Sequence, residues 1–263
     1  MPQDDSRSVE HSFGSADAGD MDDLRDSLIA LSQLAMSSMT LPEMLTSVAE
    51  FAVTAIPGAD GAGLTLQHGD RQDTVVATAD FVVEVDAIQY ALGEGPCVTA
   101  AAEGSTVRSG SLGGESRWPH FGPRVGRLGV HSVLSLPLIV DDVVLGAMNV
   151  YAREKGAFDD RAADVGEKFA GPAAIAVLNA RTLANALRLS QQLEKALVNR
   201  KVIDYAIGIL VSRTGCTSTE AFERLRAMSQ RDHVKLVDVA QSIFDEAQRR
   251  AQARRTSQQS PTL

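Results

Sequence analysis

The chain of 263 residues has few cysteines, few aromatic residues and no long apolar run. Its two cysteines, Cys97 and Cys216, fall in different predicted domains, so we expect no structural disulfide and a reducing compartment. No window reaches the roughly 18 consecutive apolar residues that a membrane helix needs. The first 23 residues are polar and acidic and contain no apolar stretch typical of a secretory signal. We therefore expect a cytoplasmic protein that makes no membrane contact.

Signatures of catalysis and metal binding are also absent from the sequence. It contains no phosphate-binding P-loop, no G-x-S-x-G motif and no H-E-x-x-H motif. The five histidines form no i, i+4 pair and no Cys/His cluster with metal-ligand spacing. There is no room for a nucleotide-binding kinase domain, and no receiver domain is present. We expect no enzyme activity and no metal site, and the sequence does not indicate which cofactor, if any, the protein binds. The input is then a ligand, a redox cue or a protein partner.

Charge is distributed unevenly along the chain, whose net charge is −9. Residues 1–26 carry a net charge of −6, and residues 27–186 carry −8. From Leu187 to the end, 13 Lys and Arg stand against 8 Asp and Glu, a net charge of +5. A basic module at the end of an acidic protein indicates an anionic partner, with nucleic acid the first class to consider.

The basic segment from Ala196 to Glu246 has the apolar spacing of three amphipathic helices. The first should end at Gly215, which can adopt the left-handed conformation after a helix. Thr217 and Glu220 have the spacing of a capping box that starts the second helix. We expect that helix to bury Ala221, Phe222 and Leu225. About 55 residues is near the lower limit for independent stability, so this unit should lean on a partner or on the preceding helix.

This segment resembles an ANTAR domain, the RNA-binding antiterminator module of bacterial regulators. The matching motifs are A-L-x-x-R-x-x-I-x-x-A-x-G-I-L from Ala196, E-A-F-x-x-L-R-x-x-S from Glu220 and K-L-x-D-V-A from Lys235. The resemblance implies an RNA-binding domain over residues 196–250 and paired leader hairpins as its target. The chain departs from the family at Ile207, where a lysine is usual, and at His233-Val234, where an asparagine is common.

Five cations on the polar faces of these helices are our candidates for RNA contacts: Arg200, Lys201, Arg213, Arg226 and Lys235. The alternative is an ordinary solvated helix face. The module would then serve protein interaction and dimerisation, and the chain would be a ligand-gated adaptor. A DNA-binding helix-turn-helix is less well supported, because the turn between the second and third helices lacks the usual glycine.

The N-terminal two thirds predict an α+β fold, with an antiparallel sheet between flanking helices. We expect a disordered acidic tail over residues 1–20 and a helix over 21–39, and then a second helix that starts at Leu41-Pro42. Alternating apolar residues predict strands over the ranges 61–66, 74–78, 106–110, 131–139 and 143–151. Asp141-Asp142 should form a hairpin turn, and Asp159 should cap the long helix that follows.

This region resembles a GAF domain, a sensory fold related to PAS domains. The matching motifs are G-E-G-P-C (Gly93 to Cys97), R-W-P-x-F (Arg117 to Phe121), S-V-L-S-L-P-L and L-G-A-M-N-V-Y. The resemblance implies a sensory domain over residues 21–178, and GAF followed by ANTAR is a familiar order in actinobacterial regulators. A pocket for an unknown small molecule is expected near Cys97, Trp118 and Phe121.

Two of these pocket residues allow a second interpretation. Cys97 stands at the start of a predicted helix, where a lowered thiol pKa would suit redox chemistry. The interpretation that we favour is a small buried apolar residue, and a single cysteine does not match the several that methionine-sulfoxide-reducing GAF proteins need. Trp118, the only tryptophan, is either a packing residue or a surface on which a ligand stacks. Cys216 is expected to be an exposed residue without a role.

A helix of residues 179–197 should connect the two domains. Leu183, Ala186, Ser190, Leu193 and Leu197 follow the 3-4-3-4 spacing of a coiled-coil seam. Either the helix dimerises in parallel and transmits a shift from sensor to output, or it packs on its own GAF domain. Residues 251–263 should form a flexible tail. Together these features predict a one-component regulator that senses a signal and binds hairpin leader RNA to promote transcription antitermination.

Overall fold

A computed structural model describes residues 10–34, 39–68 and 71–258, and it divides the chain into two compact units, residues 1–184 and 185–263. The first unit contains helices α1 (Glu10–Leu34), α2 (Leu41–Ala55), α3 (Asp80–Leu92), α4 (Pro96–Glu103) and α5 (Phe121–Arg127). Its strands are β1 (Gly61–His68), β2 (Arg71–Ala77), β3 (Val107–Ser109), β4 (Ser132–Val140) and β5 (Val143–Ala152), with a short 3-10 turn over Leu112–Gly114. Helix α6 (Asp160–Thr214) runs from the first unit into the second, which also holds α7 (Ser218–Asp232) and α8 (Leu236–Gln258).

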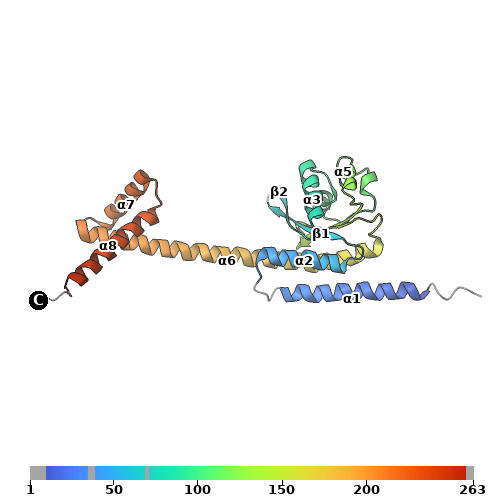
Figure 1. The fold of residues 1–263 in the computed structure, drawn as a ribbon, viewed down its shortest axis with the longest axis horizontal. Helices are drawn as coiled ribbons and strands as arrows, with labels where there is room; N and C mark the ends of the chain where they lie inside the picture. The colour runs from blue at the N-terminus through green and yellow to red at the C-terminus, as the bar shows by residue number, and fades with distance from the viewer. Residues whose placement is uncertain (1–9, 35–38, 69–70, 259–263) are drawn as a thin grey trace, which may run out of the picture. The chain divides into compact units, whose positions relative to one another are not determined.

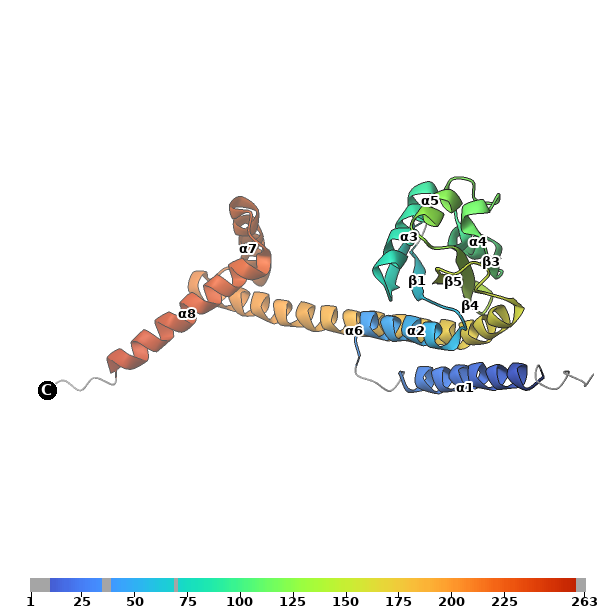
Figure 2. The ribbon, with the colours of Figure 1, turned by 45° about the vertical axis from the view of Figure 1, so that its right-hand side comes forward.

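The five strands form one antiparallel sheet in the order β2-β1-β5-β4-β3. Helix α2 and the first turns of α6 cover one face, α1 packs on α2, and α3, α4 and α5 lie over the other face (Figures 1 and 2). The expected α+β architecture with flanking helices is confirmed. The hairpin turn at Asp141 and Asp142 is also as predicted, with both residues at positive φ (50° and 62°).

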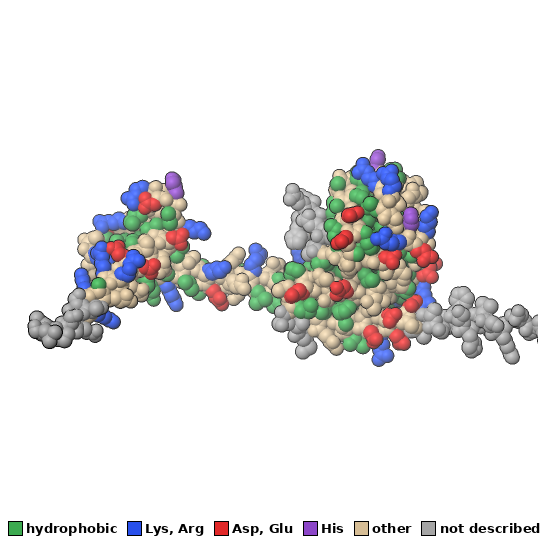
Figure 3. All heavy atoms as spheres, in the orientation of Figure 1, with side chains coloured by type: hydrophobic (Ala, Val, Ile, Leu, Met, Phe, Trp, Pro, Cys, Tyr) green, Lys and Arg blue, Asp and Glu red, His purple; other side chains and the backbone are tan. Residues whose placement is uncertain are grey.

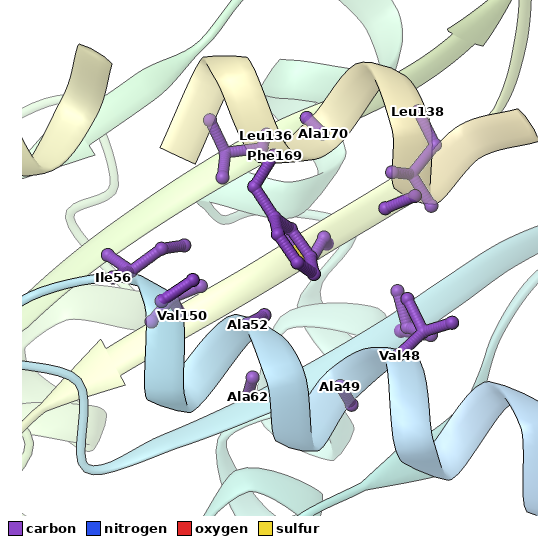
Figure 4. Close-up of a cluster of buried hydrophobic side chains, with 14 of the residues drawn as sticks. Val48, Ala49, Ala52, Ile56, Ala62, Leu136, Leu138, Val150, Phe169 and Ala170 are labelled. Atoms are coloured by element: carbon purple, nitrogen blue, oxygen red, sulfur yellow. The ribbon is translucent and has the colours of Figure 1, made fainter. Parts of the chain in front are cut away.

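Successive side chains of the neighbouring strands β4 and β5 point alternately to the two faces of the sheet. Leu134, Leu136 and Leu138 of β4 point to the side of α2 and α6, together with Met148 and Val150 of β5. Phe169 of α6 is fully buried and reaches between α2 and the sheet (Figure 4). The aromatic ring of Phe169 therefore packs α6 against both α2 and the sheet.

Close approach of α6 to the sheet depends on Gly166. A Cβ at that position would lie 2.9 Å from Leu136 Cδ1 and 3.0 Å from Leu134 Cδ2. Glycine therefore lets the helix backbone rest on the two leucines. Just upstream, the Asp159 carboxylate accepts a 2.8 Å bond from the Ala162 amide, as its predicted capping role requires.

Helix α6 continues through Pro172, which lies inside the helix. Proline removes one backbone hydrogen bond and tends to kink a helix. Here the neighbouring residues Ala170, Ala173 and Ala174 are anchored in the core, at 7%, 0% and 0% exposure. Packing on both sides of the proline therefore keeps the helix in place.

The ends of the chain contain more helix than we expected. Helix α1 starts at Glu10, so residues 10–20 are helical where we expected a tail, and residues 1–9 of that tail lie outside the described residues. Helix α8 continues to Gln258, so the flexible tail expected from residue 251 is wrong as far as residue 258, and 259–263 lie outside the described residues. Residues 10–20 and 251–258 contain no proline that would stop a helix.

The second unit is a small helical bundle. Its core consists of Ala206, Leu225, Val239, Ala240 and Ile243. Gly215 follows α6 at a φ of 69°, and the Thr217–Glu220 capping box is formed, both as predicted. The burial of Phe222 was predicted wrongly: its side chain is 38% exposed, because α7 turns Ala221 and Leu225 toward the core instead.

Candidate functional sites

A cluster of polar side chains is buried on the sheet face beneath α3 and α4. We call it the Asp86 cluster. Its fully buried members are Asp86 and Gln89 from α3, Ser135 from β4, and Asn149 and Tyr151 from β5. Asn149 and Tyr151 are two residues apart in β5 and therefore share a face of the sheet. Ser135 is the cross-strand partner of Asn149, and its hydroxyl donates to Asn149 Oδ1 at 2.8 Å.

Asp86 Oδ1 is the acceptor on which the cluster converges. It accepts bonds from the Tyr151 hydroxyl at 2.6 Å, Gln89 Nε2 at 2.8 Å and Asn149 Nδ2 at 3.4 Å. Burial, with Asp86 close by, raises the pKa of Tyr151 well above its usual value, so the phenol stays protonated and donates. The cluster therefore meets the requirement that buried polar groups be hydrogen-bonded.

Cys97 lies at the edge of this cluster. Its amide donates to Gln89 Oε1 at 3.2 Å, and its sulfur lies 3.9 Å from the Tyr90 hydroxyl. Gly95 makes this approach possible, because a Cβ there would stand 2.6 Å from Gln89 Oε1. Burial raises the pKa of the Cys97 thiol to about 11, so burial outweighs the position at a helix start that we expected to lower it. The thiol is protonated at neutral pH, which favours the packing interpretation of Cys97.

Trp118 and Phe121 belong to an apolar cluster beside the Asp86 cluster. Their rings meet edge to face with centroids 6.4 Å apart, and they are 3% and 0% exposed. Trp118 Nε1 donates to Thr99 Oγ1 at 3.0 Å, and the Arg117 guanidinium lies 4.5 Å from the centre of the indole. These contacts fix the indole in the core, as its packing interpretation requires. A ligand that reached Cys97, Trp118 or Phe121 would have to displace packed side chains.

Sequence reasoning missed the centre of the cluster. Asp86 and Gln89 are one helical turn apart in a helix that otherwise buries Val82 and Val85, and Asn149 interrupts an apolar strand. Polar residues at core positions of both elements were the available signal. Their convergence depends on the pairing of the strands and on the helix that crosses them, which no local pattern specifies.

The cations expected to contact RNA are all exposed, but they do not form one patch. Arg213 lies 13 residues after Arg200, and at about 100° per residue the two project from widely different sides of α6. Arg226 is 3.8 Å from the Glu223 carboxylate on its own helix, and Lys235 precedes α8. Figure 3 shows Lys and Arg side chains spread over the visible face of the C-terminal helices.

Ile207, at the position of the usual family lysine, packs against the core of the second unit. An apolar side chain therefore fills a place at which a cation would have to extend to solvent. Binding of an anion by this chain then depends on the other basic residues.

Comparison with protein families assigns both units. The family model of the GAF domain matches residues 38–178, and the model of the ANTAR domain matches residues 191–243. The chain belongs to the GAF domain family and carries an ANTAR domain behind the GAF domain. ANTAR domains are RNA-binding antitermination modules and GAF domains sense signals, so the chain is a signalling regulator of that general kind. This architecture is typical of regulators rather than of enzymes.

One solved structure supports the fold of the GAF domain, and two others are similar chains only. The GAF domain of a phosphoenolpyruvate-protein phosphotransferase from Coxiella burnetii has a TM-score of 0.50 and 17% identity, covering 62% of this chain and 97% of that one. A free methionine-R-sulfoxide reductase from Neisseria meningitidis, solved with its substrate, has a TM-score of 0.47 and 17% identity, covering 61% and 91%. The type II enzyme from Thermoplasma acidophilum has a TM-score of 0.43 and 16% identity, covering 52% and 94%. No curated protein matches the chain.

Within 10–34, 39–68 and 71–258, no helix is both long enough and apolar enough to cross a bilayer. The same part of the chain contains no group of three or more His, Cys, Asp or Glu side chains placed to hold a metal ion.

Proposed function

We propose that this protein is a one-component regulator whose ANTAR domain binds paired hairpins in a leader RNA and promotes transcription past a terminator. The observation that carries the proposal is a net charge of +5 from Leu187 onward, on an ANTAR domain that follows an acidic GAF domain. Proteins that read RNA sequence generally contact unpaired loop bases, because the major groove of A-form RNA is too narrow for side chains. Hairpin loops supply such bases.

The test is a salt titration of the full-length protein binding to a labelled tandem-hairpin RNA, with duplex DNA as competitor. Each phosphate contact contributes roughly 0.7 to 0.9 to the slope of log K against log salt. Arg200→Ala should weaken binding and lower that slope by about one contact. Arg231→Ala is the matched control, because the Arg231 guanidinium is already paired with Asp232 at 2.7 Å.

The proposed RNA contacts remain Arg200, Lys201, Arg213, Arg226 and Lys235. If none of the five alanine variants changed affinity or salt slope, this assignment would be overturned. If duplex DNA competed as well as the hairpins, the RNA assignment itself would fail. Salt-independent binding, or no binding, would favour the ligand-gated adaptor. The observation that supports this alternative is that Ile207 stands where the family usually has a lysine.

The proposal includes a parallel homodimer through the helix of residues 183–197. All five seam positions are exposed within the chain, and Leu183, Leu193 and Leu197 are 50%, 57% and 63% exposed. This exposure supports the dimer over packing of the seam on its own GAF domain. Light scattering of the full chain should report a dimer, which Leu193→Asp should weaken. Gln191→Asp adds the same charge outside the seam and should leave the dimer intact. A monomeric wild-type chain would contradict the proposal.

The input site is proposed on the α3 and α4 side of the sheet, around Cys97, Trp118, Phe121 and the Asp86 cluster. It would take a small molecule with polar groups, since hydrogen-bonding side chains converge there. Trp118 is the only tryptophan, so its fluorescence reports on this face alone. A ligand that binds there should change the Trp118 emission, whereas one that alters RNA binding without such a change must act elsewhere.

A further inference from the structure

The second unit contains an open groove between the end of α6 and α8, with a volume of about 690 Å³. Two aromatic side chains, one from each helix, meet in it. The rings of Tyr205 and Phe244 are stacked, with centroids 5.4 Å apart and 23° between their planes. Tyr205 is 54% exposed although it packs on Phe244, so part of its side chain faces solvent. An exposed aromatic residue in a groove is a surface on which another flat ring can stack.

Three arginines line the same groove. Arg250 and Arg254 are one turn apart on α8, and Arg213 belongs to α6. Arg250 also contacts the Glu246 carboxylate on its own helix. In the part of the chain that the structure describes, no ion pair involves Arg213 or Arg254. The one acidic lining residue is Asp204. The groove therefore combines an aromatic surface with an excess of positive charge.

Gly208 keeps the groove open. It lies inside α6, where glycine is less favourable than alanine, and it lines the groove. Nothing lies within 4 Å of the point where its Cβ would stand. Packing within the unit therefore does not require glycine at this position, whereas a side chain would narrow the groove.

We propose that this groove binds an unpaired nucleotide of the target RNA, with the base stacked on Tyr205 and the adjoining phosphates held by Arg213, Arg250 and Arg254. This inference rests on the proposed RNA binding and gives it a base-binding site. Aromatic stacking accepts any exposed base, and a basic groove follows the backbone of a single strand. A base within a duplex is already stacked on its neighbours, so the groove should select loops over stems.

The groove extends beyond the part of the chain that resembles the family. The ANTAR match ends at residue 243, whereas Phe244, Arg250 and Arg254 all follow it. Helix α8 continues to Gln258 and carries these three residues. One wall of the site is therefore supplied by the extension of α8.

The test uses the full-length protein and two labelled probes: a tandem-hairpin RNA with 5-iodouridine in each loop, and a single-stranded RNA octanucleotide. Irradiation should cross-link the loop to Tyr205. Tyr205→Ala should weaken binding of both probes by roughly 5- to 150-fold, the usual range for loss of one stacked base. Tyr205→Phe keeps the ring and should stay within about twofold of the wild type. Tyr205→Leu keeps apolar volume without an aromatic face and should behave like the alanine variant.

The arginines are tested by a double substitution, Arg250→Gln with Arg254→Gln. The slope of log K against log salt should fall by about 1.4, since each contact with a single strand contributes about 0.7. Arg231→Gln is the control, because that guanidinium pairs with Asp232 and does not line the groove. It should change neither affinity nor slope.

The outcomes separate this inference from the proposed function. Hairpin binding that is unaffected in Tyr205→Ala and Tyr205→Leu would overturn the groove and leave RNA binding standing. Failure to bind the hairpins, with Tyr205-dependent binding of the octanucleotide, would refute the proposed function and retain the groove. Binding of neither RNA would overturn both. A cross-link that maps outside the groove would also contradict the inference.

Discussion

Replacement of Asp86 should destabilise the GAF domain more than replacement of any exposed carboxylate. Asp86 Oδ1 accepts a hydrogen bond from the Tyr151 hydroxyl, and it also accepts bonds from Gln89 Nε2 and Asn149 Nδ2. In Asp86→Ala the Tyr151 donor loses that acceptor inside the core. Gln89 and Asn149 retain weaker contacts, at 3.2 Å to the Tyr151 oxygen and 3.4 Å to Thr65 Oγ1.

The expected loss of stability in Asp86→Ala follows from the number of hydrogen bonds that are lost or weakened. One buried donor left without its acceptor costs about 1–3 kcal/mol, and each weakened bond adds about 0.5–1.5 kcal/mol. Removal of a buried carboxylate also relieves its desolvation, which offsets part of the loss. We therefore expect Asp86→Ala to lower the free energy of unfolding by about 2–5 kcal/mol. Asp86→Asn keeps one acceptor oxygen and the side-chain shape, so it should cost less.

The assay is urea unfolding of the full chain followed by the fluorescence of Trp118, which monitors the GAF domain because it is the only tryptophan. The matched control is Asp160→Ala. That carboxylate pairs with Arg108 at 2.7 Å but is 99% exposed, so its loss should cost no more than about 1 kcal/mol. The reasoning would be refuted if both alanine variants unfolded at the same urea concentration with the same slope.

Three further predictions concern the core, a helix cap and the cysteines. Phe169→Ala should destabilise the GAF domain by about 3–5 kcal/mol in the same assay, because it leaves a cavity between α2 and the sheet; a loss below about 1 kcal/mol would contradict the packing of Phe169 between these elements. Thr217→Ala removes the N-cap of α7 and should cost about 0.5–2 kcal/mol, measured by thermal unfolding of the helical circular dichroism signal, with Thr219→Ala as a control. The raised pKa of Cys97, about 11, leaves almost no thiolate at pH 7.5, so iodoacetamide should label the partly exposed Cys216 there and reach Cys97 only near pH 11 or after unfolding; rapid labelling of Cys97 in the native protein would contradict its burial.

Local patterns predicted those parts of the fold that depend on neighbours in sequence. The Thr217–Glu220 capping box, the cap at Asp159 and the turn at Asp141-Asp142 each involve residues a few positions apart, and all three formed as expected. The pattern of apolar residues predicted the five strands, whose alternate side chains point to opposite sides of the sheet.

The parts that were missed depend on contacts between distant residues. Asp86 and Tyr151 are 65 positions apart and meet only after α3 crosses the finished sheet. Tyr205 and Phe244 meet only when α8 folds back on α6. The sequence alone placed Phe222 in the core because it fits the apolar stripe of α7, but packing against α6 and α8 selected Ala221 and Leu225. The spacing of apolar residues identifies the apolar face of a helix. It does not specify which residues of that face point directly at the neighbouring helices.

The hydrogen bonds within the Asp86 cluster limit how a small molecule could bind at the proposed input site. The polar groups that would recognise such a molecule already bond to one another, and Trp118 and Phe121 fill the space beside them. A ligand of this site must therefore break these bonds or bind a minor open state. In the second case its apparent affinity is its intrinsic affinity multiplied by the fraction of molecules that are open. Substitutions that loosen the cluster without removing its polar groups, such as Phe121→Leu, should then strengthen ligand binding while they weaken the fold. Weaker binding in such a variant, measured by Trp118 fluorescence, would show instead that the packed face itself is the ligand-binding surface.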